Sequence, residues 1–138
     1  MQKINKKVLV AEDNELNQLL VKSMLEAWGC EVDIAANGLE ALNKVKENNY
    51  DIVLMDFQMP VMDGLIATRE IRNLPGADKS NLIIIAFTSV DYRDEKKYAD
   101  NGMDGYIIKP WDEENLNLKI TELLNNQLYT TMNSNQHP

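Results

Sequence analysis

The sequence predicts an α/β protein in which five βα units follow one another and build a parallel sheet with helices on both faces. Short apolar runs alternate with longer stretches whose apolar residues have helical spacing. Four of the five runs are almost continuous in apolar residues, which is typical of strands covered on both faces. The length of 138 residues suits one domain, and the alternation implies right-handed crossovers.

The first two helices are each predicted from an apolar stripe next to a boundary signal. Leu16, Leu20, Met24 and Ala27 share one face, and Gly29 follows as a C-cap. The second helix begins near Asn37, which has Glu40 three residues later, and its stripe is Ala41, Leu42 and Val45. The predicted strands are residues 7–11, 31–35, 51–55, 82–87 and 105–108.

The remaining helices are predicted in the same way, and one of them has a weaker pattern. The third helix ends at Pro75-Gly76, and Asp112 is the N-cap of the last helix. Residues 91–101 are dense in charge, so we expect a weakly packed surface helix there. The domain is expected to span residues 1–126, and residues 127–138 to form a polar, frayed tail. The apolar stripe of the third helix is Ala67, Ile71 and Leu74, and that of the last helix is Leu116, Ile120, Leu123 and Leu124.

Composition excludes several classes of protein. With 14 basic and 22 acidic residues, the net charge of −8 disfavours sequence-independent nucleic-acid binding and permits an acidic pocket for a cation. The single cysteine, Cys30, rules out an internal disulfide, and the single histidine, His137, leaves no internal histidine for zinc or general-base chemistry. No apolar run approaches the ~20 residues of a membrane span. We therefore expect a cytoplasmic protein.

Side chains that can bind a metal ion or take part in a reaction follow four of the five predicted strands. Glu12 and Asp13 follow the first strand, Asp56 the third, Thr88 the fourth and Lys109 the fifth. Sites in open parallel sheets form beyond the carboxyl ends of the strands, so these groups should meet at one edge. Clustered carboxylates repel one another without a cation, and oxygen ligands suit Mg²⁺.

Each of these residues also has an ordinary structural role when taken alone. Asp13 suits a helix cap, Asp56 a turn, Thr88 a strand-end hydroxyl satisfied by backbone, and Lys109 a solvated surface position. Chance would scatter such groups over both edges of the sheet, so their joint placement favours a site. Tyr106 in the fifth strand suits either sheet packing or a mobile role. The chain has no glycine-rich phosphate loop, which disfavours a nucleotide site.

Four segments together resemble the receiver domain of two-component response regulators, in particular the C-terminal receivers of hybrid sensor histidine kinases. The resemblance covers residues 5–126 and implies a flavodoxin-like, doubly wound five-stranded sheet, (βα)5, in three α/β/α layers. The segments are Val8–Asn14, Leu54–Gly64 around Asp56, Thr88 and Gly105–Pro110.

The resemblance implies a role for each site residue. Asp56 would accept the phosphoryl group; Asp13, Asp56 and the backbone carbonyl of Gln58 would bind Mg²⁺, with Glu12 acting through water. It further implies that Thr88 and Lys109 contact the phosphoryl group, that Lys109 contacts Asp56 when this group is absent, and that Tyr106 is the aromatic switch residue. Gln58 and Val90 occupy the positions that set phosphoryl lifetime.

The implied function is a signalling switch that takes its phosphoryl group from a phosphohistidine. The donor would be a histidine kinase or a histidine phosphotransfer domain, met through an apolar patch to which Leu16, Leu19 or Val21 contributes. We do not expect an enzyme that turns over a substrate, although the domain would catalyse its own phosphorylation and dephosphorylation. We also expect no direct contact with nucleic acid or membrane, and a monomer or weak homodimer.

Three alternatives stay open at this point. A Mg²⁺-dependent aspartyl-phosphate phosphohydrolase would use Asp56 as nucleophile, but Gln58 stands where such enzymes have a second aspartate. A non-phosphorylated, partner-binding pseudo-receiver would normally lack one of the acids or the lysine, and all are present. A binding module for small anions has no support in the sequence. The chain is either a stand-alone protein or part of a hybrid kinase.

Overall fold

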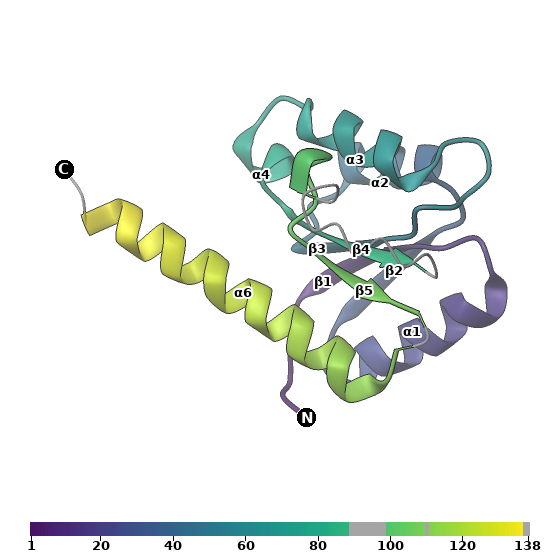
Figure 1. Ribbon diagram of the computed structural model, residues 1–138, viewed down its shortest axis with the longest axis horizontal. Coiled ribbons are helices and arrows are strands. Elements are labelled where there is room, and N and C mark those ends of the chain that lie inside the picture. The colour runs from purple at the N-terminus through teal and green to yellow at the C-terminus, as the bar shows by residue number, and fades with distance from the viewer. Residues whose placement is uncertain (89–98, 110, 137–138) are drawn as a thin grey trace.

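The protein contains one five-stranded parallel sheet with the strand order β2-β1-β3-β4-β5. The computed structural model describes the backbone of residues 1–88, 99–109 and 111–136, and the side chains of residues 1–87, 99–109 and 111–126. Figure 1 shows the sheet between two layers of helices. The elements are β1 (Lys7–Ala11), α1 (Glu15–Ala27), β2 (Glu31–Ala35), α2 (Gly38–Glu47), β3 (Ile52–Met55), α3 (Gly64–Arg72), α4 (Ala77–Ser80), β4 (Ile83–Thr88), β5 (Gly105–Ile108) and α6 (Glu113–Gln136).

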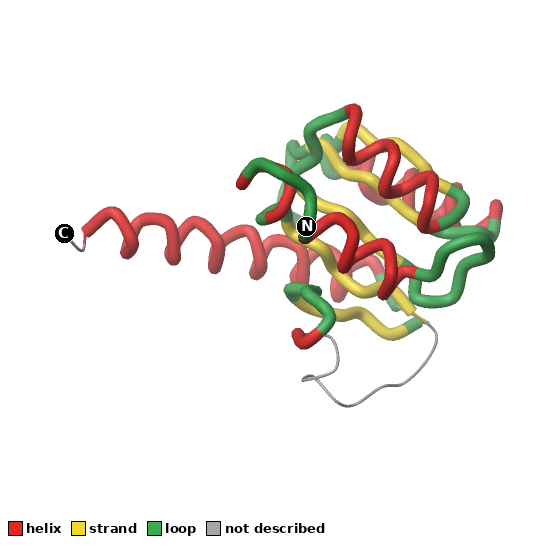
Figure 2. Tube along the Cα trace, turned by 90° about the horizontal axis from the view of Figure 1, so that it is seen from above, coloured by secondary structure: helices red, strands yellow, loops and turns green. Residues whose placement is uncertain are grey.

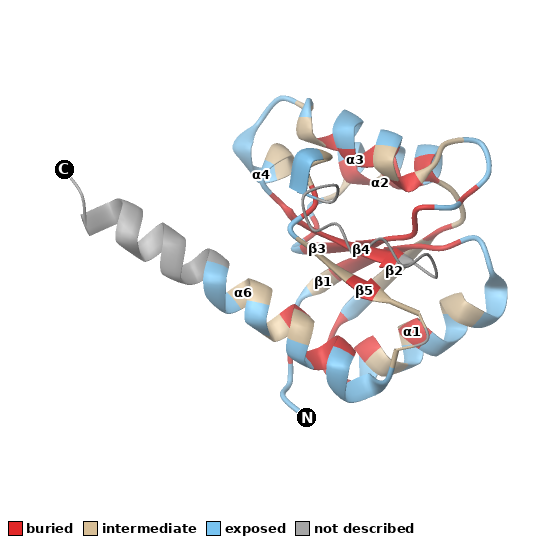
Figure 3. Ribbon diagram, viewed as in Figure 1, coloured by how far each residue is buried: buried red, intermediate tan, exposed pale blue. Residues whose placement is uncertain are grey.

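The predicted fold class is confirmed, and all five predicted strands are present within one residue of their expected bounds. An apolar core lies on each face of the sheet, which explains why the central strands are apolar on both faces. Alternate residues of β1, β3 and β4 pack against α2 and α3 on one face and against α1 and α6 on the other. Figure 3 shows the buried residues gathered along the sheet and on the helix faces turned toward it.

Helix α1 packs with a different face from the predicted one. Its buried residues are Val21 and Leu25, whereas Leu16, Leu19 and Leu20 are 65%, 64% and 47% exposed. The helix carries apolar residues on two neighbouring stripes, so periodicity alone does not decide which stripe meets the sheet. The burial of Val21 also corrects its expected place in an exposed patch.

The predicted helix boundaries agree with the structure at two N-termini. The side chain of Asn37 accepts from the Glu40 backbone N–H at 2.8 Å, and Asp112 accepts from that of Asn115 at 2.7 Å. The third predicted helix is α3, and after it the short helix α4 was not anticipated. Most of the helix expected over residues 91–101 lies outside the described residues.

Helix α6 continues much farther than the sequence indicated. Residues 127–136, expected to be frayed, are helical to Gln136. Both Figure 1 and Figure 2 show this end of α6 extending away from the sheet. Adding a residue to an existing helix requires no new nucleus, so a packed first half favours continuation through a polar sequence. Within the described parts of the chain, no helix is both long and apolar enough to span a bilayer.

Candidate functional site

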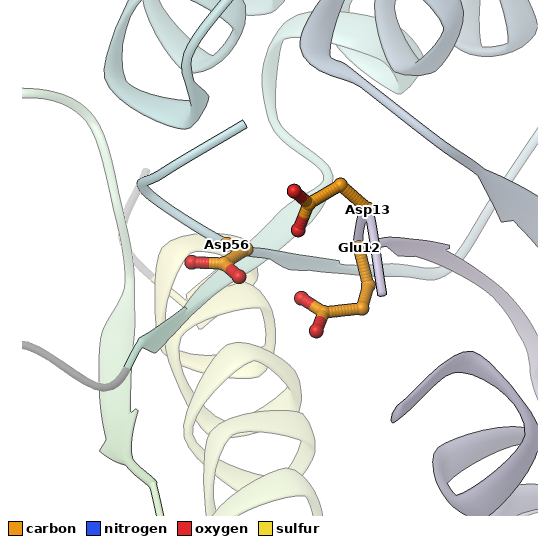
Figure 4. A group of neighbouring side chains, drawn as sticks. All are labelled: Glu12, Asp13 and Asp56. Atoms are coloured by element: carbon orange, nitrogen blue, oxygen red, sulfur yellow. The ribbon is translucent and has the colours of Figure 1, made fainter. Parts of the chain in front are cut away.

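Three carboxylates meet at the carboxyl edge of the sheet. Glu12 and Asp13 follow β1 and Asp56 follows β3; the two strands are neighbours in which Ala11 pairs with Met55. One carboxylate oxygen from each residue lies within 4.8 Å of the others, and Figure 4 shows the three side chains around a common space. Glu12 and Asp56 are buried whereas Asp13 is exposed. The cluster therefore opens to solvent on the side of Asp13.

The predicted lysine lies among these carboxylates. The Nζ atom of Lys109 is 3.1 Å from Asp56 Oδ2 and 3.1 and 3.0 Å from the two carboxylate oxygens of Glu12. The contact with Asp56 is the expected one, but the contact with Glu12 was not anticipated. One ammonium group thus partly neutralises two buried carboxylates.

Burial makes Glu12 an unusual carboxylic acid. Loss of hydration, and secondly the adjacent Asp56 carboxyl group, raises the pKa of Glu12 to about 7. Asn17 and Lys109 act in the opposite direction because they favour the ionised form. In the metal-free protein, Glu12 therefore exchanges its proton close to neutral pH.

This raised pKa predicts that the metal-free protein loses stability as the pH rises. The unfolded chain has a Glu12 pKa near the ordinary 4.5, so folding favours the protonated form between pH 4.5 and about 7. Above that window, the ionised Glu12 should cost about 3 kcal/mol of unfolding free energy. Urea unfolding in EDTA from pH 5 to pH 8 measures this loss, and Glu12→Gln should have a flatter profile. Equal pH dependence in the two proteins would contradict the buried position of Glu12.

Two amides that the sequence analysis missed hold Glu12 in place. Asn17 Nδ2 donates to Glu12 Oε1 at 2.6 Å, and Gln18 Nε2 donates to the Glu12 backbone carbonyl at 2.6 Å. The first turn of α1 is itself fixed by Asn14, whose side chain accepts from the Asn17 backbone N–H at 3.0 Å. Asn14 is therefore the helix cap, and the capping role considered for Asp13 is wrong.

The loop after β3 fixes the position of Asp56. The Gln58 backbone N–H donates to Asp56 Oδ1 at 3.2 Å, and the Gly64 N–H donates to the Phe57 carbonyl at 3.0 Å. A Cβ atom at Gly64 would collide with the Asp56 carbonyl oxygen, so only glycine permits this close approach. The predicted metal-ligand role of the Gln58 carbonyl stays a prediction.

The other predicted site residues lie on β4 and β5 or beyond them. Thr88 ends β4, and its backbone pairs with Ile108 of β5, so it reaches the same sheet edge; its side chain lies outside the described residues. Val90 also lies outside them. Tyr106 is half-buried and packs against the core that α2 and α3 cover. The structure thus brings together Glu12, Asp13, Asp56 and Lys109.

This arrangement matches a family of known proteins. The family model described as the response regulator receiver domain matches residues 8–121. Hybrid signal transduction histidine kinase I of Dictyostelium discoideum is 37% identical in an alignment 147 positions long that covers 99% of this chain. The chain spans only 8% of the length of that kinase, and 11% and 10% of two further histidine kinases that it matches.

Two solved structures have the same architecture. The receiver domain of a sensor histidine kinase from Pseudomonas aeruginosa, crystallised with magnesium in its active-site cleft, is 31% identical with a TM-score of 0.79, covering 88% of this chain and 99% of that one. The receiver domain of the Saccharomyces cerevisiae response regulator Ssk1, in complex with the histidine phosphotransfer protein Ypd1, is 32% identical with a TM-score of 0.77, covering 85% and 87%.

Proposed function

Because the chain belongs to the response regulator receiver domain family of two-component phosphorelays, we propose that Asp56 is its phosphoacceptor. The observation that carries this proposal is the contact of Asp56 with Lys109 at 3.1 Å inside a cluster of three carboxylates. The ionised carboxylate is the form that attacks phosphorus, and the Lys109 ammonium group lies directly beside it. The exposed side of the cluster gives a donor access to it.

The proposed reaction transfers a phosphoryl group from nitrogen to oxygen. A carboxylate oxygen of Asp56 forms a bond to phosphorus as the phosphorus–nitrogen bond of a phosphohistidine breaks, and the leaving imidazole keeps the electron pair and takes a proton. Such transfers depend on alignment and charge neutralisation. The Lys109 ammonium group lies where it can move from the carboxylates to the phosphoryl oxygens. The hydrogen bond from the Asn17 amide holds the Glu12 carboxylate in place during this movement.

The residues at this edge suit a hard divalent cation. Carboxylate oxygens within 4.8 Å of one another, one of them solvent-exposed, fit Mg²⁺, which keeps several waters when bound. Asp13, Asp56 and the Gln58 carbonyl would hold the ion directly and Glu12 through water. When bound, Mg²⁺ would neutralise the negative charge of the phosphoryl oxygens.

Mg²⁺ is therefore expected to stabilise the fold by binding only the native state. At a concentration 100 times the Kd, the gain is about 2.7 kcal/mol, which raises the melting temperature of a domain this size by several degrees. Thermal melts over a Mg²⁺ titration measure this shift, and Asp13→Asn should move the titration to higher concentrations. A melting temperature that Mg²⁺ leaves unchanged would count against the metal site.

We also propose that Tyr106 reports the phosphorylated state, with Thr88 and Lys109 as the coupling groups. Driving a two-state switch from 1:99 to 99:1 requires roughly 5.5 kcal/mol of differential binding free energy. A hydrogen bond from Thr88 to the charged phosphoryl group would contribute about 1.5–3 kcal/mol, so Thr88 alone is insufficient. Thr88→Ala should therefore weaken the shift and Lys109→Ala should nearly abolish it. Ring NMR of Tyr106 with and without beryllofluoride tests this, and identical spectra in the unmutated protein would refute the switch. Gln58 and Val90 are proposed to tune phosphoryl lifetime.

The proposed partner is a histidine phosphotransfer domain or a histidine kinase, in the cytoplasm, and the domain acts as a monomer or weak homodimer without turnover of small substrates. The experiment is to mix the chain with a radiolabelled phosphohistidine phosphotransfer protein and Mg²⁺. Label should leave the donor and appear on the chain, and EDTA should prevent the transfer. Retention of all label by several such donors would contradict the proposed partner class.

A further inference from the structure

Lys109 lies against an aromatic ring as well as against carboxylates. Its Nζ atom is 4.7 Å from the ring centroid of Phe87, within the range of a cation–π interaction. Phe87 pairs with Ile107 of β5, two residues before Lys109, and strand residues two apart point to the same face of a sheet. The lysine side chain therefore crosses the face of this ring on its way to Asp56.

The Phe87 ring is firmly held. Phe87 is fully buried, in the core that α1 and α6 cover. Its ring contacts that of Trp111 with centroids 5.2 Å apart and planes tilted by 40°. A ring packed on these sides has little freedom to turn, so its π face presents a constant surface to the ammonium group.

The ammonium group needs such a partner because water reaches it poorly. The Lys109 side chain is 16% exposed, and its two ion-pair partners, Glu12 and Asp56, are 1% and 9% exposed. The negative potential of a ring face stabilises a poorly hydrated cation, whereas an aliphatic side chain of similar size offers none. The ring contact also does not depend on the charge of Asp56, which changes when the phosphoryl group arrives.

We propose that Phe87, supported by Trp111, is a positioning residue for Lys109, which holds the ammonium group at the level of the Asp56 carboxylate. The proposal rests on the proposed function of Asp56 as phosphoacceptor. Its consequence is that the rate of phosphoryl transfer depends on the electron density of the Phe87 ring, and not only on the ring's volume.

Fluorination separates electron density from volume. We would incorporate mono-, di- and trifluorinated phenylalanine at position 87 and measure the rate of phosphorylation by acetyl phosphate with Mg²⁺. Each fluorine weakens the ring's attraction for a cation while the shape is nearly kept. The rate should fall stepwise along the series, to roughly one fifth for the trifluorinated ring. Equal rates along the series would overturn the proposal.

A stability cycle tests the same contact without phosphorylation. In EDTA, fluorination of Phe87 should lower the melting temperature stepwise in the unmutated protein but not in Lys109→Met, where the cation is absent. The same decrease in both backgrounds would mean that Phe87 only fills the core. If the unmutated chain is never labelled at Asp56, the proposed function fails, and this cycle still decides whether Phe87 holds Lys109.

Discussion

Replacing Asp56 with asparagine is expected to abolish phosphorylation of the chain by acetyl phosphate. The amide that replaces the carboxylate is uncharged and a poor nucleophile, so labelling should fall below roughly 1% of that of the unmutated protein. The fold should persist, because Asn keeps the shape of Asp and one oxygen for the Gln58 N–H. Intact-mass spectrometry after incubation with acetyl phosphate and Mg²⁺ measures the effect directly.

The matched control is Asp51→Asn. Asp51 lies immediately before β3, at the opposite end of the strand from Asp56, is exposed, and accepts from the Lys7 backbone N–H at 2.9 Å. It has no part in the site, so this variant should be labelled like the unmutated chain. Undiminished labelling of Asp56→Asn would mean that another residue accepts the phosphoryl group.

Replacing Lys109 with methionine should strongly destabilise the metal-free protein at pH 8. Methionine has a similar length and stays apolar over the Phe87 ring, but it leaves two buried carboxylates without their shared cation. Removing one partner of a buried ion pair costs about 3–5 kcal/mol. Lower pH should reduce the cost because Glu12 can then take up a proton. Urea unfolding in EDTA at pH 8 and pH 5 measures both effects.

Two comparisons isolate the charge. Lys46→Met removes an exposed lysine on α2 and should change stability little. Adding Asp56→Asn to Lys109→Met should restore part of the lost stability, because only one buried carboxylate then remains. If Lys109→Met is as stable as the unmutated protein at pH 8, the ion pairs contribute nothing to the fold.

The sheet was predictable because four of its five strands are almost continuous in apolar residues. Continuous apolar runs such as residues 82–87 are typical of buried parallel strands when they alternate with helical stretches. The face of α1 that packs on the sheet was not predictable in the same way. Leu16 and Leu20 form one apolar stripe and Val21 and Leu25 another, and the spacing does not show which stripe is buried. The extension of α6 was missed because residues 127–138 are mostly polar, although Leu128 and Met132 continue the four-residue spacing of Ile120 and Leu124.

The location of the site follows from the same regularity, and its internal contacts do not. Parallel strands bring their carboxyl ends to one edge, so Glu12, Asp56 and Lys109 were expected to meet. The hydrogen bond from Asn17 to Glu12 depends on the length and rotamer of both side chains. The sequence around Phe87 is typical of an ordinary buried strand. It does not indicate the contact of this ring with Lys109, because that contact depends on how β4 and β5 are aligned.

The most direct test is to find which residue of the unmutated chain carries the phosphoryl group. The chain is phosphorylated with acetyl phosphate and Mg²⁺, reduced with borohydride, which converts an aspartyl phosphate to homoserine, and sequenced by mass spectrometry. We predict homoserine at position 56 alone, and none when EDTA replaces Mg²⁺. Homoserine at another aspartate, or a chain without homoserine after full exposure to the donor, would contradict the assignment of Asp56 as phosphoacceptor.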